Sequence, residues 1–141
     1  MSENKADQGA LSQGRNFVWH EVYGPKVQAS LDFYTKALGF GTQEMPMGEM
    51  GTYTMLTRGG MPIAGVMGTS EMPGMENIPP HWATYLSVEN LDESLATVQE
   101  HGASVHVPAM TVPTVGRMAL IADPQGAHIW LFEPDMSASQ A

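Results

Sequence analysis

The chain repeats one pattern of residues in its two halves, and this repeat constrains its fold more than any other feature. Three apolar residues at helical spacing have counterparts 64 positions later: Val27, Leu31 and Tyr34 correspond to Leu91, Leu95 and Val98. A strand-like segment precedes each triplet, at 17–23 and 81–88, and an apolar segment that begins with glycine follows each one, at 60–67 and 126–132. A unit of about sixty residues is too long for a solenoid repeat and too short to bury a good core alone. We therefore expect both copies to share one core, with a cleft between them.

Length and composition limit the classes of protein to which this chain can belong. At 141 residues it fits a single domain, and without cysteine it has neither disulfides nor a thiolate-ligated zinc cluster. The net charge of -9 opposes binding to nucleic acid or to an anionic membrane surface. No apolar run approaches the roughly twenty residues that span a bilayer, and the first sixteen residues are polar, without the apolar segment typical of a secretory signal. The composition predicts a soluble, cytoplasmic protein that binds neither nucleic acid nor membrane.

The first module is predicted to span residues 16–67 in the order strand, helix, strand, strand, strand. Alternation along its first strand divides the side chains between two faces, with Phe17, Trp19, Glu21 and Tyr23 on one and Val18, His20 and Val22 on the other. The helix buries a stripe at residues 27, 31, 34 and 38 and ends at Gly39. Strands at 42–47, 51–57 and 60–67 complete the module.

The second module is predicted to span residues 81–134 in the same order. Asn90 is a good N-cap for its helix because Glu93 follows three residues later, and Gly102 ends the helix. Its strands are expected at 81–88, 104–107, 116–122 and 127–132. Residues 68–80 form a linker, whereas the leader at 1–15 and the tail at 135–141 lack periodicity and read as disordered.

Two motifs and the doubled order resemble those of the vicinal oxygen chelate superfamily of glyoxalases, bleomycin resistance proteins and extradiol dioxygenases. The motifs are the segment at 30–40 after the first strand and the Asp123-Pro-Gln-Gly126 turn before the last strand. The resemblance covers residues 16–134. It implies an α+β fold in which two βαβββ modules form a pair of curved, mixed-sheet half-barrels around a small-molecule pocket. It also implies a homodimer, by analogy.

Metal-dependent members of that superfamily hold their ion with His, Glu or Gln at four positions. The resemblance carries these positions onto Trp19, Ala64, Ala83 and Trp130, whose indole and methyl groups cannot ligate a divalent cation. We therefore predict no metal and no cofactor. An alternative stays open, in which Glu21, His81 and His128 form a displaced metal site.

Glu21 is the leading candidate for proton transfer. It lies between Trp19 and Tyr23 on the inward face of its strand, where burial favours the protonated form of a carboxyl group. A general acid or base that works near neutral pH needs that property. The alternative is a structural role, with a hydrogen bond to Arg117 or to a tyrosine hydroxyl group. Tyr85 and His128 are the candidates for the acid or for the donor to an oxyanion.

A further set of side chains is predicted to contact the substrate, with core packing as the alternative. The set comprises Trp19, Tyr23, Tyr53, Arg117, Trp130 and Phe132. Among the other histidines, His20 is expected to be a hydrogen-bonded residue facing the helix, and His101 and His106 are expected at the surface. The predicted ligand is a small organic molecule, apolar or aromatic, whose identity the sequence does not reveal.

Three functions follow from these residues. The leading one is a metal-independent isomerase or lyase that uses acid–base chemistry in an aromatic cleft. The second is a non-catalytic binder that sequesters an antibiotic or metabolite. The third is a metal-dependent lyase or dioxygenase that uses the displaced ligands.

Overall fold

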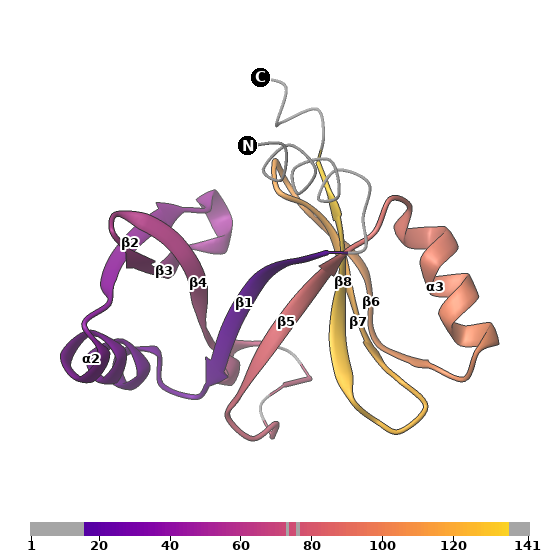
Figure 1. Cartoon of the computed structure of the whole chain (residues 1–141), viewed down its shortest axis with the longest axis horizontal. Helices are drawn as coiled ribbons and strands as arrows, with labels where there is room; N and C mark the ends of the chain where they lie inside the picture. Colours follow the sequence, from indigo (N-terminus) through magenta and orange to yellow (C-terminus); the bar gives the residue numbers. More distant parts are fainter. Residues whose placement is uncertain (1–15, 73, 76, 136–141) are drawn as a thin grey trace, which may run out of the picture. The chain divides into compact units, whose positions relative to one another are not determined.

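The chain forms two compact units in the computed structural model, which describes residues 16–72, 74–75 and 77–135. The N-terminal unit is Trp19–Ala83, and the C-terminal unit combines Met1–Val18 with Thr84–Ala141. The predicted leader, and the tail after Asp135, lie outside the described residues. Strands β1 (Phe17–Gly24) and β5 (His81–Ser87) each contain residues of both units (Figure 1).

The N-terminal unit is a four-stranded mixed sheet with one helix. After β1 come α2 (Val27–Leu38), β2 (Gly41–Pro46), β3 (Thr52–Arg58) and β4 (Met61–Gly68). The strand order is β2-β3-β4-β1, in which β1 pairs with β4 in parallel and the other pairs are antiparallel. Short 3-10 turns occur at Gly48–Met50 and Thr69–Glu71. This unit has the predicted order of strand, helix, strand, strand, strand.

Helix α2 packs on one face of this sheet through the predicted apolar stripe. Val27, Leu31 and Tyr34 contact a buried cluster of sheet residues, Val22, Leu56 and Val66. The prediction that Leu38 continues the stripe is wrong, because its side chain is 51% exposed. Gly39 adopts the left-handed conformation with φ 77° and turns the chain there, so that Phe40 packs against the cluster instead.

The C-terminal unit repeats the design with α3 (Leu91–Glu100), β6 (Ser104–Val112), β7 (Gly116–Ala122) and β8 (His128–Pro134). Its strand order is β5-β8-β7-β6, with β5 and β8 parallel and the other pairs antiparallel. Strand β6 is five residues longer than predicted. The strand continues through Pro108, because β6 lies at an end of the strand order and its pairing with β7 shifts register between Val105 and Met110, which accommodates a proline. With this unit the predicted α+β fold class is confirmed.

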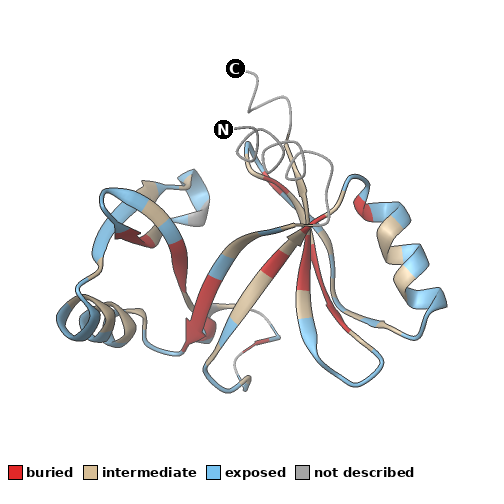
Figure 2. Cartoon of the chain, viewed as in Figure 1, coloured by how far each residue is buried: buried red, intermediate tan, exposed pale blue. Residues whose placement is uncertain are grey.

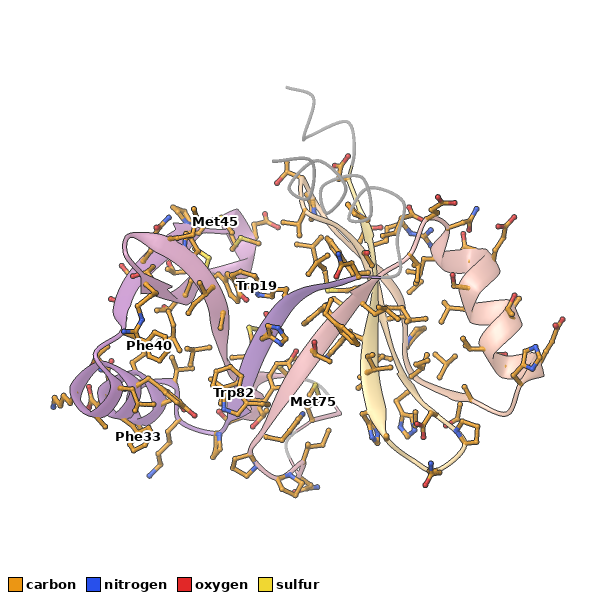
Figure 3. All side chains as sticks on the ribbon, viewed as in Figure 1. Trp19, Phe33, Phe40, Met45, Met75 and Trp82 are labelled. Carbon is orange, nitrogen blue, oxygen red and sulfur yellow. The ribbon has the colours of Figure 1, made fainter. Side chains whose placement is uncertain are left out.

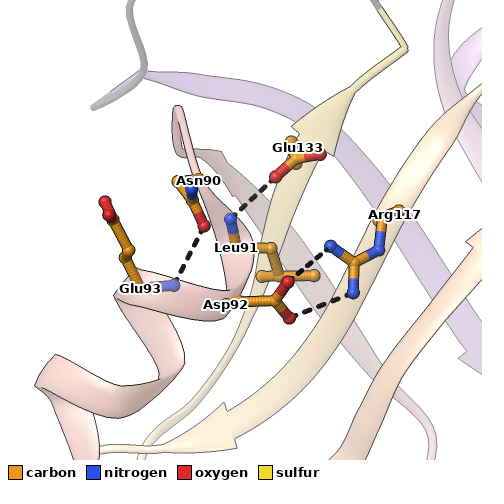
Figure 4. A network of polar contacts seen from close by, with 6 residues as sticks. All are labelled: Asn90, Leu91, Asp92, Glu93, Arg117 and Glu133. Atoms are coloured by element: carbon orange, nitrogen blue, oxygen red, sulfur yellow. Dashed lines mark hydrogen bonds and ion pairs between the residues drawn. The ribbon is translucent and has the colours of Figure 1, made fainter.

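Polar contacts fix the start of α3 on the sheet (Figure 4). Asn90 caps the helix as predicted, because its side chain accepts a hydrogen bond from the Glu93 backbone N–H at 3.0 Å. The Leu91 N–H, which has no partner within the helix, donates to Glu133 Oε1 at 2.8 Å. The Leu91 side chain is fully buried in a cluster with Ala119, Ile121 and Leu131. The second helix is therefore held by both its cap and its apolar face.

Buried residues recur along β1, β4, β7 and β8 (Figure 2), where they occupy consecutive positions and therefore lie on both faces of the sheet. His20 departs from prediction, since its side chain is exposed instead of packed and hydrogen-bonded beneath the helix. Among the described residues, neither helix has the length and apolar character needed to traverse a lipid bilayer.

Candidate functional site

A buried carboxylate surrounded by aromatic side chains is the most unusual feature of the N-terminal unit. The Glu21 side chain is 6% exposed. Its Oε1 accepts a hydrogen bond from the Tyr23 hydroxyl group at 2.6 Å, and its Oε2 accepts one from the Tyr53 hydroxyl group. A tyrosine hydroxyl group is therefore a partner of Glu21, as predicted, whereas the choice between a catalytic and a structural role stays a prediction. Both carboxylate oxygens are thus held by phenol hydroxyl groups.

The register of three strands brings these residues together. Glu21 on β1 lies opposite Gly65 on the neighbouring strand β4, and Gly65 lies opposite Met55 on β3. Tyr53 is two residues before Met55, so its side chain is on the same face and crosses β4 to reach Glu21. A Cβ atom on Gly65 would lie 1.7 Å from the Tyr53 hydroxyl oxygen. Only glycine at position 65 allows this crossing.

Trp19, which is labelled in Figure 3, also belongs to this group of residues. Its indole Nε1–H donates to the Tyr53 hydroxyl oxygen at 2.8 Å. Burial and the neighbouring Glu21 charge raise the pKa of Tyr53 well above its ordinary value of 10.0. Tyr53 therefore keeps its proton and serves as a hydrogen-bond donor to Glu21. We call Trp19, Glu21, Tyr23 and Tyr53 the Glu21 cluster.

One position taken from the family resemblance is wrong. Ala64 was placed on the same side as Trp19, but it lies opposite Leu56, a core residue beneath α2. Gly65 is the β4 residue on the Glu21 face. Because side chains alternate along a strand, an error of one residue moves the position to the other face of the sheet.

Aromatic side chains also cover a face of the C-terminal unit. The Tyr85 and Trp130 rings are stacked, with centroids 5.3 Å apart and planes 9° apart, and Phe132 meets Tyr85 edge-on at 6.4 Å. The Trp130 Nε1–H is buried and has no hydrogen-bond partner among the described residues. Such a group costs about 1 to 3 kcal/mol of stability unless a bound acceptor satisfies it.

Arg117, another predicted substrate contact, lies on the other face of the C-terminal sheet. Its guanidinium group forms two hydrogen bonds of 3.1 Å with the Asp92 carboxylate on α3 (Figure 4). This pair lowers the pKa of Asp92 and raises that of Arg117. Arg117 pairs with Glu133 of β8 and shares its face of the sheet. Because side chains alternate along a strand, Trp130 and Phe132 of β8 lie on the other face.

The histidines of the displaced metal site have other neighbours. His81 Nδ1 lies 2.8 Å from the Pro79 carbonyl oxygen, and its ring packs against Tyr23 at 5.2 Å. His128 belongs to the C-terminal unit, where its ring contacts His106 at 4.6 Å. Within the described part of each unit, no group of three or more His, Asp or Glu side chains is arranged to hold a metal ion. The displaced site stays a prediction.

A groove lies elsewhere in the N-terminal unit and does not include Glu21. It has a volume of about 470 Å³ and is bordered mainly by polar side chains of α2, β2 and β3. Its lining residues are Gln28, Leu31, Asp32, Thr35, Thr42, Glu44 and Thr54. We consider the Glu21 cluster the better candidate for chemistry, because a buried and hydrogen-bonded carboxylate is more specific than an open polar groove.

Comparisons with known proteins agree with this fold. Residues 16–131 match the family model of the Glyoxalase/Bleomycin resistance protein/Dioxygenase superfamily. CFP32 of Mycobacterium tuberculosis, which bears the name glyoxylase, is 33% identical over 82% of this chain and 44% of its own length. The anthracycline biosynthesis protein DnrV of Streptomyces peucetius is 30% identical over 77% of this chain and 43% of its own length. The chain thus spans less than half the length of these relatives.

A solved structure shows the same fold at low sequence identity. The crystal structure of methylmalonyl-CoA epimerase from Mycobacterium tuberculosis aligns with a TM-score of 0.62 and 17% identity. The alignment covers 94% of this chain and 96% of that protein.

Proposed function

Because the chain belongs to the glyoxalase/bleomycin resistance protein/dioxygenase superfamily, we propose that it binds a small organic molecule at the Glu21 cluster and transfers a proton there. The reaction class is isomerisation or lyase-type elimination without a metal ion. The observation that supports this proposal is the buried Glu21 carboxylate, held by two phenol donors on an aromatic face.

Glu21 acts as the base in this proposal. Each of its oxygens accepts a hydrogen bond from a tyrosine hydroxyl group. In this proposal the carboxylate takes a proton from a carbon next to a carbonyl group of the bound molecule. The tyrosines fix the orientation of the carboxylate, so that little reorganisation is needed during the reaction.

The acid is proposed among the hydroxyl groups that contact Glu21. Tyr53 keeps its single hydroxyl proton and donates it to the carboxylate. In the proposed complex this O–H turns from Glu21 to the bound carbonyl oxygen and stabilises the negative charge that develops there. Tyr85 and His128, which were predicted for this role, belong to the C-terminal unit. Those assignments stay predictions.

An apolar or aromatic ligand fits the indole and phenol rings of Trp19, Tyr23 and Tyr53. The similarity to a protein of anthracycline biosynthesis supports an aromatic guest.

Binding of an anthracycline aglycone should change the tryptophan fluorescence of the protein, and Trp19→Phe should remove most of that change. Trp82→Phe is the matched control, because Trp82 bonds to Tyr34 outside the cluster. An equal response in the two variants would argue against the cluster as the binding site.

Glu21→Gln separates catalysis from binding. The amide keeps the size of the carboxylate but cannot accept a proton as a base, so turnover should fall by at least about 100-fold. Affinity, measured by the same fluorescence titration, should stay within a few-fold of the wild type. A variant that retains full turnover would remove Glu21 from the mechanism.

A non-catalytic binder is the second candidate function. The two tyrosine hydrogen bonds that prepare Glu21 for proton transfer can also serve only to hold a buried carboxylate. In that case the wild-type protein binds the anthracycline aglycone but converts none of the carbonyl compounds that are offered to it as substrates. Fluorescence binding without any turnover would favour this function.

A further inference from the structure

We propose that His106 and His128 form a two-histidine binding site for a divalent transition metal ion on the C-terminal unit. The two residues lie on β6 and β8, with β7 between them. Their ring centroids are 4.6 Å apart and the ring planes are inclined by 55°. The site is independent of the Glu21 cluster, which belongs to the other unit.

A small residue between the histidines allows this contact. Ala122 on β7 lies opposite His128 on one side and opposite Ser104 on the other. Ala122 carries only a methyl group, and the rings of His106 and His128 are in contact with each other. Both histidines are exposed, so a hydrated ion can reach them.

The geometry suits chelation by two imidazoles. A metal ion held at about 2.1 Å from one nitrogen of each imidazole places the two ring centres about 5 Å apart. The observed separation of 4.6 Å is close to that value. The planes of the two rings are inclined by 55°, so the rings are tilted and not stacked face to face.

A hydrogen bond with Ser104 orients His106, one of the two proposed ligands. Ser104 Oγ lies 3.3 Å from His106 Nε2. When the serine oxygen accepts the Nε2–H proton, the neutral ring carries its lone pair on Nδ1, which can then bind the metal. This partner outside the coordination sphere is typical of histidines that bind metals.

The donor set indicates which ions would bind. Imidazole nitrogens suit Zn²⁺, Ni²⁺ and Cu²⁺, with Cu²⁺ bound most tightly. Asp123 has a role in the turn before β8, where its Oδ1 accepts the backbone N–H groups of Gln125 and Ala127. With two protein ligands, the remaining coordination positions are filled by water or by donor atoms of a small molecule.

The first test uses Zn²⁺ and isothermal titration calorimetry on the full chain. The wild type should bind one ion per chain, and His106→Ala and His128→Ala should each weaken this binding at least tenfold. His20→Ala and His101→Ala are matched controls at exposed histidines and should bind as the wild type does. Unchanged affinity in the two ligand variants, or an equal loss in the controls, would overturn the site.

The second test needs no substitution. Substoichiometric Cu²⁺ broadens the NMR signals of protons near the ion, and the chain has five histidines. The ring signals of His106 and His128 should broaden first, while those of His20, His81 and His101 stay sharp. Uniform broadening of all five would show adventitious binding and contradict the proposal.

Discussion

At the scale of single residues, the account depends on Glu21 and its two hydroxyl donors. The alternation of the first strand was enough to predict that Trp19, Glu21 and Tyr23 share a face, and their hydrogen bonds are consistent with it. The part played by Tyr53 could not be predicted, because it depends on the register of β3 and β4. The signal in the sequence was Gly65, a glycine inside an apolar strand, which often marks a close approach by another group.

The raised pKa of Tyr53 gives a test at this scale. Four tyrosines are present, and an ultraviolet titration of the folded protein to about pH 11 should miss Tyr53. Tyr53→Phe should therefore leave the tyrosinate absorbance of the folded protein unchanged. In urea, the same substitution should lower the tyrosinate absorbance by the contribution of one tyrosine. A native signal that also drops by one would show that Tyr53 ionises normally.

The same pKa shift affects stability at high pH. The folded protein holds the Tyr53 proton more tightly than the unfolded chain does, so this stabilisation is complete below the ordinary pKa of 10.0 and is lost as pH rises above it. Urea unfolding between about pH 9 and 11 should lose less stability in Tyr53→Phe than in the wild type. An equal or steeper loss in the variant would contradict the shift.

At the scale of elements, local signals predicted the helices better than the edges of the sheet. Asn90 and Gly39 marked the start of α3 and the end of α2 because capping depends on neighbouring residues. The extent of β6 was underestimated because the pairing with β7, which tolerates Pro108, is a long-range contact. The exposure of Leu38 has a different cause, because the turn at Gly39 redirects the chain and brings Phe40 to the core instead.

Gly65→Ala tests the crossing of β4 by Tyr53. The new methyl group would overlap the Tyr53 hydroxyl group, so Tyr53 must move away from Glu21. We expect a loss of about 1 to 3 kcal/mol in the free energy of unfolding, measured with urea. Gly24→Ala is the control, because its added Cβ would lie at an ordinary 3.9 Å from Pro80 Cβ. Equal stability of the two variants would contradict the packing described.

Asn90→Ala tests the cap of α3. Loss of the hydrogen bond to the Glu93 backbone N–H should cost about 1 kcal/mol of stability in urea unfolding. Gln99→Ala, at an exposed position of the same helix, should have little effect. A cost no larger than that of the control would mean that the cap does not stabilise the helix.

At the scale of the whole molecule, the internal repeat and two motifs were enough to predict the superfamily, which the family model confirms. The substrate could not be predicted in the same way, because function depends on the residues of a site more than on the fold. The chain spans less than half the length of the curated relatives named above. Its oligomeric state is a second property that belongs to the whole molecule.

The predicted homodimer can be checked by light scattering coupled to size-exclusion chromatography. Phe33 and Trp82 of the N-terminal unit are 57% and 48% exposed, and a second copy would bury such surfaces (Figure 3). The single chain has a mass of 15.2 kDa, and the expected result is twice that mass. A concentration-independent mass of one chain would contradict the dimer.

The most direct test of proton transfer at Glu21 is hydrogen exchange from bound substrate into D₂O. A panel of aromatic ketones with an acidic C–H next to the carbonyl group is incubated with the protein, and loss of the C–H signal is followed by proton NMR. We predict exchange of at least one compound by the wild type, and exchange at least about 100-fold slower with Glu21→Gln. Exchange at the same rate by the wild type and Glu21→Gln would contradict the central claim.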